Sequence, residues 1–168
     1  MARVVTICHP GKGVGRSLLV VQLAASAGLP VLVIDADPAG DTMAALTPAY
    51  PVPVFEDRPV RRSVLGGVSL APASVLGPML TGADPAALAH VVRRWRAGYA
   101  LALIDTAAGI GPAAVAAVGA ADAALVPTRL DAACVGELRT YLRLLPELAA
   151  RTRAAVLGAY MAALAPPR

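Results

Sequence analysis

The sequence predicts an α/β protein with a mostly parallel sheet and helices on both of its faces. Short apolar runs alternate along the chain with longer segments of helical character, which is typical of this architecture. The runs are almost continuously apolar, as in strands that are covered on both faces. Because 57% of the residues are hydrophobic and only 15% are charged, the composition excludes a disordered chain.

We expect six strands, four helices and a single domain over residues 1–168. Gly28 is a helix stop signal, and Asp84-Pro85 fits a capping residue followed by a proline at the first helical position. Residues 47–59 contain four prolines and are expected to be mostly loop. The expected strands are 3–8, 31–34, 68–71, 99–104, 123–126 and 154–161. The expected helices are 17–27, 85–96, 112–120 and 131–150, the last interrupted near Pro146.

The charge and the apolar segments narrow the class of protein. The net charge of +4 and the pI near 9.6 permit contact with anions, including nucleotides and nucleic acids. The uncharged stretch 17–34 is interrupted by Gly28-Leu29-Pro30, so a helix followed by a buried strand explains it better than a membrane span. No signal-peptide pattern is present at the N-terminus, and Cys8 and Cys134 form neither a metal-binding nor a disulfide pattern. We therefore expect a cytoplasmic protein without a membrane span.

The most informative segment is His9-Pro10-Gly11-Lys12-Gly13-Val14-Gly15-Arg16-Ser17, which follows the first expected strand. A glycine-rich loop between a strand and a helix directs backbone N–H groups and the helix dipole at one point, where they bind phosphate. The usual pattern of this kind ends in Gly-Lys-Ser/Thr. Here it ends in Gly15-Arg16-Ser17, and the lysine lies four positions earlier, at Lys12.

Acidic residues follow two other expected strands. Asp35 and Asp37 come after the second strand, and Asp105 comes after the fourth. The carboxyl ends of parallel strands meet at one edge of a sheet, so these side chains are expected to converge with the loop. Carboxylates there suit Mg²⁺ or the orientation of a water molecule. Two plainer alternatives stay open, a turn for Asp35 and Asp37 and a helix N-cap for Asp105.

In this order and spacing, the three segments resemble the ParA/MinD family of deviant Walker-type ATPases, which partition or position DNA, cell-division sites and other cargo. The family's motifs read Lys-Gly-Gly-x-Gly-Lys-Thr/Ser, then Asp-x-Asp-Pro-Gln-Gly-Asn, then Asp-Thr/Cys-Pro-Pro-Gly. The corresponding segments here are Gly11-Lys12-Gly13-Val14-Gly15-Arg16-Ser17, Asp35-Ala36-Asp37-Pro38-Ala39-Gly40-Asp41 and Asp105-Thr106-Ala107-Ala108-Gly109. The resemblance runs from Val4 to about Met161.

The resemblance implies that ATP and Mg²⁺ bind at the loop and that a homodimer encloses the nucleotides between its subunits. Asp37 would orient the attacking water, and Lys12 and Arg16 would supply catalytic positive charge. Mg²⁺ would be held by Ser17, Asp35 and Asp105. Nucleotide would be bound by Gly11, Lys12, Gly13, Val14, Gly15, Arg16, Ser17 and Leu18. A ParB-like or other activating partner and non-specific DNA are further partners that the resemblance implies.

Two loop positions and the length depart from the family pattern. The family's first lysine, which reaches the nucleotide of the partner subunit, is replaced by Gly11. Its second lysine, which binds phosphate within the subunit, is replaced by Arg16, whose side chain is larger and planar. The chain is also expected to be truncated at its C-terminus relative to the family, without the Asn that would contact adenine.

Three functions therefore stay open. The leading one is a ParA-like ATPase for plasmid or chromosome partitioning, or for intracellular positioning by nucleotide-dependent dimerisation. The second is an interaction module that keeps the fold but does not hydrolyse ATP, which Gly11 and Arg16 favour. The third is a biosynthetic enzyme similar to dethiobiotin synthetase or to the synthetase domain of the cobyrinate amidotransferases. The scattered arginines fit either a DNA-contacting face or ordinary solvated surface.

Overall fold

The computed structural model describes residues 2–47, 60–77, 85–129, 131–150 and 155–161. One sheet is formed by seven strands, which are β1 Arg3–Ile7, β2 Val31–Ala36, β3 Arg61–Arg62, β4 Val68–Ala71, β5 Leu101–Thr106, β6 Ala123–Thr128 and β7 Ala155–Met161. The helices are α1 Arg16–Ser26, α2 Asp41–Leu46, α4 Pro85–Trp95, α5 Pro112–Ala120 and α6 Ala132–Ala150, with a short 3-10 helix, η1, at Ala73–Val75.

The sheet is parallel except at one edge. The strand order is β3-β4-β2-β5-β1-β6-β7, and only the pair β3 and β4 runs antiparallel. Strands β1 and β5 are adjacent, but the chain leaves them toward opposite edges of the sheet. It runs from β1 to β2 on one side and from β5 to β6 on the other. Such a reversal opens a crevice at the carboxyl ends of the strands, which is where ligands bind in open α/β sheets. The predicted fold class is confirmed.

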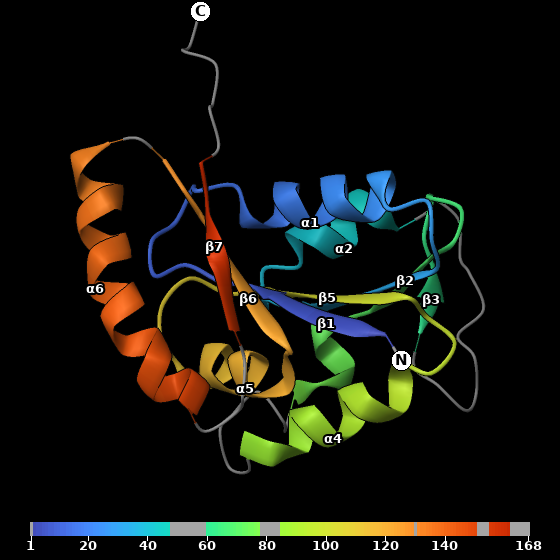
Figure 1. The fold of residues 1–168 in the computed structure, drawn as a ribbon. Helices are drawn as coiled ribbons and strands as arrows, with labels where there is room; N and C mark the ends of the chain where they lie inside the picture. The colour runs from blue at the N-terminus through green and yellow to red at the C-terminus, as the bar shows by residue number, and fades with distance from the viewer. Residues whose placement is uncertain (1, 48–59, 78–84, 130, 151–154, 162–168) are drawn as a thin grey trace, which may run out of the picture.

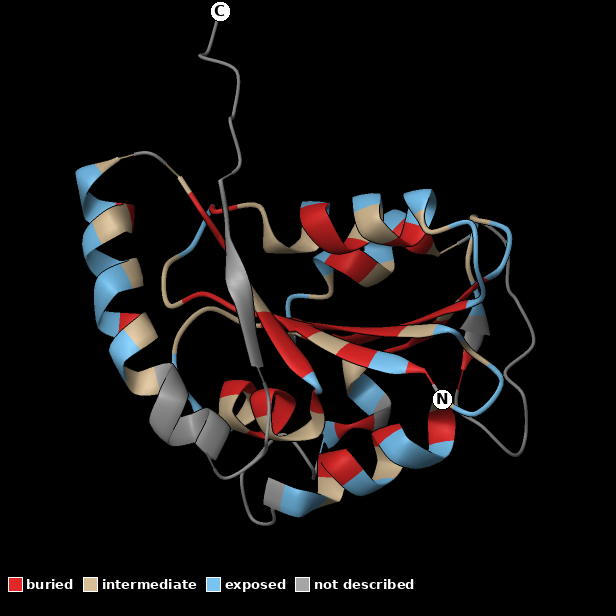
Figure 2. Ribbon diagram, viewed as in Figure 1, coloured by how far each residue is buried: buried red, intermediate tan, exposed pale blue. Residues whose placement is uncertain are grey.

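Helices cover both faces of the sheet (Figure 1). Helices α1 and α2 lie on one face and α4 and α5 on the other, while α6 lies beside the β6 end. Strands β1, β2, β4, β5 and β6 are buried along most of their length between these layers, as Figure 2 shows. This double coverage explains why the strands carry continuous rather than alternating apolar sequences.

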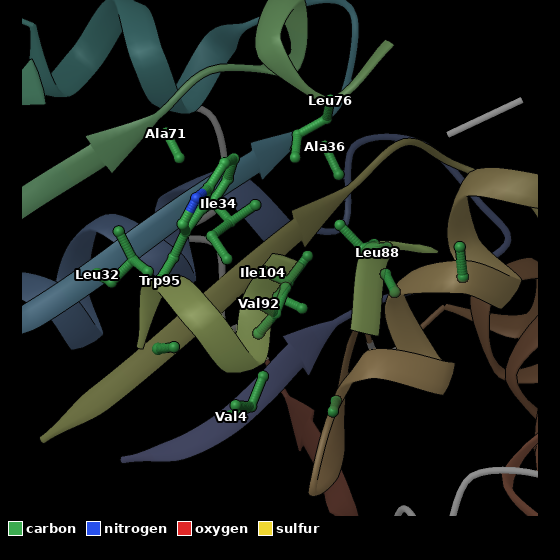
Figure 3. Close-up of a cluster of buried hydrophobic side chains, with 14 of the residues drawn as sticks. Val4, Leu32, Ile34, Ala36, Ala71, Leu76, Leu88, Val92, Trp95 and Ile104 are labelled. Carbon is green, nitrogen blue, oxygen red and sulfur yellow. The ribbon is translucent and has the colours of Figure 1, made fainter. Parts of the chain in front are cut away.

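The larger core cluster lies between the sheet and the pair α4 and α5 (Figure 3). Its centre is formed by Leu32 and Ile34 of β2 and Ile104 of β5, which pack near Val92 and Trp95 of α4. A second cluster, on the face of α1 and α2, contains mostly Val and Leu side chains. The core is therefore built mainly from aliphatic residues, with Trp95 as its largest member.

The structure differs from the predicted elements in several places. Helix α2, strand β3 and η1 were not predicted. Strands β2, β5 and β6 each extend two residues beyond the predicted ends, and β5 begins two residues later than predicted. The interruption predicted at Pro146 is wrong, because α6 continues to Ala150. A proline removes one backbone hydrogen bond from a helix without having to end it. The predicted loop after Thr47 and the cap at Asp84 lie outside the described residues.

Among the described residues, the structure contains no helix that is both long enough and apolar enough to cross a membrane. This finding agrees with the interpretation of residues 17–34 as a helix followed by a strand, since α1 ends at Ser26 and β2 begins at Val31.

Asp122 stabilises the start of β1. Its Oδ2 accepts a hydrogen bond from the Val4 N–H at 2.8 Å and lies 3.6 Å from Nη1 of Arg96. We expect Asp122→Ala to lower the free energy of unfolding by about 1 kcal/mol, because it removes an acceptor from a strand N–H. Urea denaturation would measure the change. Asp122→Asn is the control, since it keeps an acceptor and should cost less; equal stability of Asp122→Ala and wild type would contradict the assignment.

Candidate functional site

The loop between β1 and α1 is shaped by two glycines in the left-handed region. Gly13 has φ 68° and Gly15 has φ 84°, conformations that glycine adopts without steric cost. Val14 lies between them and is buried, which anchors the loop. Gly15 is the N-cap of α1, where no side chain caps the helix and the first turn holds no acidic residue. The unpaired N–H groups and the helix dipole therefore make this end of α1 suited to an anion.

Arg16 bonds to carbonyl groups of its own loop. Its Nη1 donates to the Gly11 oxygen at 2.6 Å and to the His9 oxygen at 3.2 Å. The buried His9 ring holds the loop from the other side, because its Nδ1 accepts a hydrogen bond from the Gly11 N–H at 2.9 Å. Burial lowers the pKa of His9, in keeping with a neutral ring that accepts at Nδ1. Nε of Arg16 is buried without a hydrogen-bond partner among the described residues, so part of the guanidinium is unused.

Asp35 and Asp105 lie directly opposite each other on the adjacent strands β2 and β5. Both are fully buried. Burial raises the pKa of Asp35 to about 6, although its carboxylate accepts hydrogen bonds from the N–H groups of Met43 at 2.9 Å and Asp37 at 3.1 Å. Burial raises the pKa of Asp105 as well. Two buried carboxylates side by side are costly to ionise without a cation nearby.

Helix α2 and the first turn of α1 both reach Asp105. The Thr42 hydroxyl donates to Oδ2 of Asp105 at 2.6 Å. The Ser17 side chain lies near this carboxyl group and partly offsets the rise in its pKa that burial causes. The other oxygen, Oδ1, is buried and has no hydrogen-bond partner among the described residues. Thr42 was missed in the sequence because α2 was not predicted. The available signal was Gly40-Asp41, a turn residue followed by an acid suited to the first turn of a helix.

The remaining predicted site residues lie at the edge of this cluster. The carboxylate of Asp37 accepts a hydrogen bond from the Ala39 N–H at 2.9 Å, which is the turn that the sequence left open. Lys12 is exposed, and Leu18 is 51% exposed on the first turn of α1. The structure thus brings together Ser17, Asp35 and Asp105, and leaves Asp37, Lys12 and Leu18 around them.

Two charged side chains that the sequence did not single out reach the loop from beyond β6. Nη1 of Arg129 donates to the Gly13 oxygen at 3.4 Å. The carboxylate of Glu137, on α6, lies so close to Gly11 that a Cβ at this position would collide with it. The sequence offered little signal for either residue, because only the parallel pairing of β6 with β1 places them beside the loop.

Neither cysteine offers an accessible nucleophile. Cys8 and Cys134 are both buried and form no disulfide. Burial raises the pKa of the Cys8 thiol to about 11, so it is protonated at neutral pH. Cys8 therefore acts as a small core residue directly after β1.

The residues present fit Mg²⁺ in the company of a phosphate ligand. The described residues contain no group of three or more His, Cys, Asp or Glu side chains able to hold a metal alone. Magnesium does not need such a cage, because it usually binds through one or two carboxylates together with substrate phosphates and water. The Ser17 hydroxyl and Oδ1 of Asp105, which has no hydrogen-bond partner among the described residues, are suitable oxygen ligands for Mg²⁺. Asp35 lies opposite Asp105 on the neighbouring strand β2.

No protein-family model and no curated protein matches this sequence, but solved structures resemble it. A plasmid partition protein from Borrelia burgdorferi superimposes with a TM-score of 0.81 at 16% identity, covering 100% of this chain and 81% of that one. The septum site-determining protein MinD from Pyrococcus horikoshii, complexed with Mg-ADP, gives 0.71 at 18% identity, with 95% and 69% covered. Cobyrinic acid a,c-diamide synthase from Mycobacterium smegmatis, with an ATP analogue and magnesium, gives 0.79 at 21%, with 96% and 75% covered.

These similarities settle the fold. The chain shares its fold with the plasmid partition protein and with MinD, in agreement with the fold that the resemblance of its three motifs implied. The same fold is present in a biosynthetic enzyme. Function must therefore be argued from the site, since one fold supports several activities.

Proposed function

We propose that this chain is a ParA-like protein that binds ATP with Mg²⁺ at the loop between β1 and α1. The observation that carries the proposal is the position of this loop beside the buried, opposed carboxylates of Asp35 and Asp105. An anion-binding helix terminus next to buried acids is an arrangement that a phosphate and a cation satisfy together. Proteins of the same fold were solved with Mg-ADP or with an ATP analogue and magnesium.

In this proposal the residues of the loop have different roles in nucleotide binding. The N–H groups of the loop from Gly13 onward, together with the first turn of α1, bind the phosphates. Arg16 keeps the loop in shape through its two carbonyl contacts and directs the rest of its guanidinium at phosphate. Lys12, exposed on the rim, adds charge, and Gly11, Val14 and Leu18 complete the expected nucleotide-binding set.

The acidic residues would hold the cation and the water. Ser17 and Asp105 would hold Mg²⁺, supported by Asp35, and bound Mg²⁺ would neutralise charge that develops on the phosphates. Asp37 lies at the same edge and would orient the attacking water once its carboxylate leaves the Ala39 N–H. This role for Asp37 is the one that makes the protein an ATPase rather than a nucleotide carrier.

A homodimer that encloses the nucleotides is part of the proposal. Two large apolar side chains flank the loop region without being buried, Leu18 and Ile110, each 51% exposed. Ile110 follows a segment that contacts the phosphate loop, because the Gly109 N–H donates to the His9 oxygen at 3.3 Å. A second subunit would cover both side chains. An activating ParB-like partner and non-specific DNA would act on this dimer, in plasmid or chromosome partitioning or in positioning other cargo.

A second candidate is a nucleotide-binding interaction module that does not hydrolyse ATP. It is favoured by the surroundings of Gly11, where the family pattern has the lysine that reaches across the dimer. The carboxylate of Glu137 lies where the side chain of such a lysine would begin. A protein without that lysine keeps the means to bind phosphate but lacks a charge that the family's reaction uses.

Binding and turnover would separate these candidates. We expect a fluorescent ATP analogue to bind wild type at sub-millimolar concentration and to bind more tightly with Mg²⁺. Asp105→Asn, which keeps an acceptor for Thr42 but loses the charge, should remove most of the Mg²⁺ effect. No binding at millimolar ATP would contradict the proposal. Release of phosphate by wild type but not by Asp37→Asn supports the ATPase, and binding without turnover supports the module.

Oligomeric state gives a second readout. Light scattering should detect a doubling of mass when ATP and Mg²⁺ are added, and Leu18→Glu or Ile110→Glu should prevent it. Dimerisation that is unaffected by either substitution would place the interface elsewhere.

A further inference from the structure

A cation from outside the phosphate loop lies against it. Arg129 directly follows β6, and β6 pairs in parallel with β1, so both strands end at the same edge of the sheet. Nη1 of Arg129 donates to the Gly13 oxygen at 3.4 Å. The same nitrogen lies 3.5 Å from where a Cβ on Gly13 would be. The guanidinium of Arg129 therefore contacts the loop at Gly13, where the absence of a side chain leaves room for it.

Asp131 holds Arg129 in this position. Nε of Arg129 donates to Oδ2 of Asp131 at 2.9 Å, while Oδ1 of Asp131 accepts from the Cys134 N–H at 2.9 Å. One carboxylate thus caps the first turn of α6 and orients the guanidinium. Because the helix terminus fixes Asp131, Arg129 is a positioned cation rather than a freely moving surface side chain.

The orientation leaves donors of Arg129 free. Nε and Nη1 have partners, and among the described residues Nη2 has none. The side chain is 39% exposed, so the guanidinium is accessible to a ligand beside the loop. Arg16, by contrast, is engaged with two loop carbonyls. The most available fixed cation at the loop is therefore Arg129.

We propose that Arg129 binds the terminal phosphate of a bound nucleoside triphosphate, and so discriminates triphosphates from diphosphates. This inference rests on the proposed nucleotide-binding function. The loop N–H groups and α1 enclose the phosphates that ATP and ADP share. The terminal phosphate of ATP extends beyond these two phosphates. There the guanidinium of Arg129, directly after β6, would bind it through charge-assisted hydrogen bonds.

The test compares three variants and three ligands by titration calorimetry. The ligands are ATP, ADP and inorganic triphosphate, each with Mg²⁺. We expect Arg129→Ala to weaken ATP and triphosphate binding about tenfold, the effect of losing one charged hydrogen bond, and ADP binding less than about threefold. Arg129→Lys should recover part of the loss. Arg139→Ala removes a charge from an exposed position of α6 and is the matched control, expected to behave as wild type.

Each outcome decides the matter. A loss confined to ATP and triphosphate supports the inference, because a merely structural role in shaping the loop would weaken ADP binding equally. Equal losses for ATP and ADP, or no difference from Arg139→Ala, overturn it. If wild type binds triphosphate through Arg129 but binds no ATP, the proposed function fails and the phosphate contact stands. If wild type binds none of the three ligands, both are wrong.

Discussion

Replacement of Arg16 by alanine is expected to weaken Mg-ATP binding about 100-fold, on the order of 3 kcal/mol. The substitution removes a positive charge at the phosphates. It also removes the hydrogen bonds at 2.6 Å and 3.2 Å that join the Gly11 and His9 carbonyl groups. The loop then loses both a ligand contact and the clamp that shapes residues 9–11. Titration with a fluorescent ATP analogue measures the change.

Two controls make this result specific. Arg16→Lys keeps the charge and one carbonyl contact, so its affinity should stay within about tenfold of wild type. Arg3→Ala removes an exposed arginine from the other end of β1 and should leave binding unchanged. If Arg16→Ala binds Mg-ATP as tightly as wild type, Arg16 has no part in the site.

Acidification from pH 7 to pH 5 is expected to weaken Mg²⁺-dependent nucleotide binding about tenfold. Burial raises the pKa of Asp35 to about 6 in the ligand-free protein. A cation needs the ionised carboxylate, so each pH unit below this pKa reduces affinity toward a tenfold loss. Burial also raises the pKa of Asp105, which acts in the same direction. Asp35→Asn should flatten the profile, and an unchanged profile in this variant would assign the pH effect to another group.

The stability of the ligand-free protein should change in the opposite sense. The pKa of Asp35 is about 6 in the folded chain and near 3.8 when unfolded, so the folded state binds more protons between these values. Stability therefore falls as pH rises through this window, by about 3 kcal/mol at most. Urea denaturation at pH 4.5 and pH 7.5 would reveal this contribution as the difference between wild type and Asp35→Asn. Added Mg²⁺ should reduce the loss at the higher pH if the site binds the cation.

The fold was largely predictable because its determinants are local. Short continuous apolar runs bounded by turn residues, such as 31–34, favour strands covered on both faces, and the order of strands and helices then restricts the topology. Helix α2 escaped prediction because a six-residue helix carries too little periodicity to be recognised. The interruption predicted at Pro146 was wrong because a proline removes one backbone hydrogen bond without having to end the helix, and α6 continues to Ala150.

The candidate site was also predictable only in part from the sequence. Its strand-end acids, Asp35 and Asp105, and its glycine-rich loop are visible in the chain because each is a short motif at a strand end. Their convergence follows from parallel pairing alone. The contacts of Thr42, Arg129 and Glu137 depend on which strands are neighbours and on how α2 and α6 pack, which no local pattern specifies.

Sequence alone was therefore sufficient for the fold class and for the place where phosphate is expected, because backbone conformation and strand burial are written into consecutive residues. Tertiary structure was needed to learn what each charge does there. Arg16 bonds to carbonyl groups of its own loop, Asp35 and Asp105 are buried side by side on adjacent strands, and Arg129, which follows β6, contacts the loop. The physical reason is that charges interact through distance and dielectric surroundings, and both are set by chain segments far apart in the sequence.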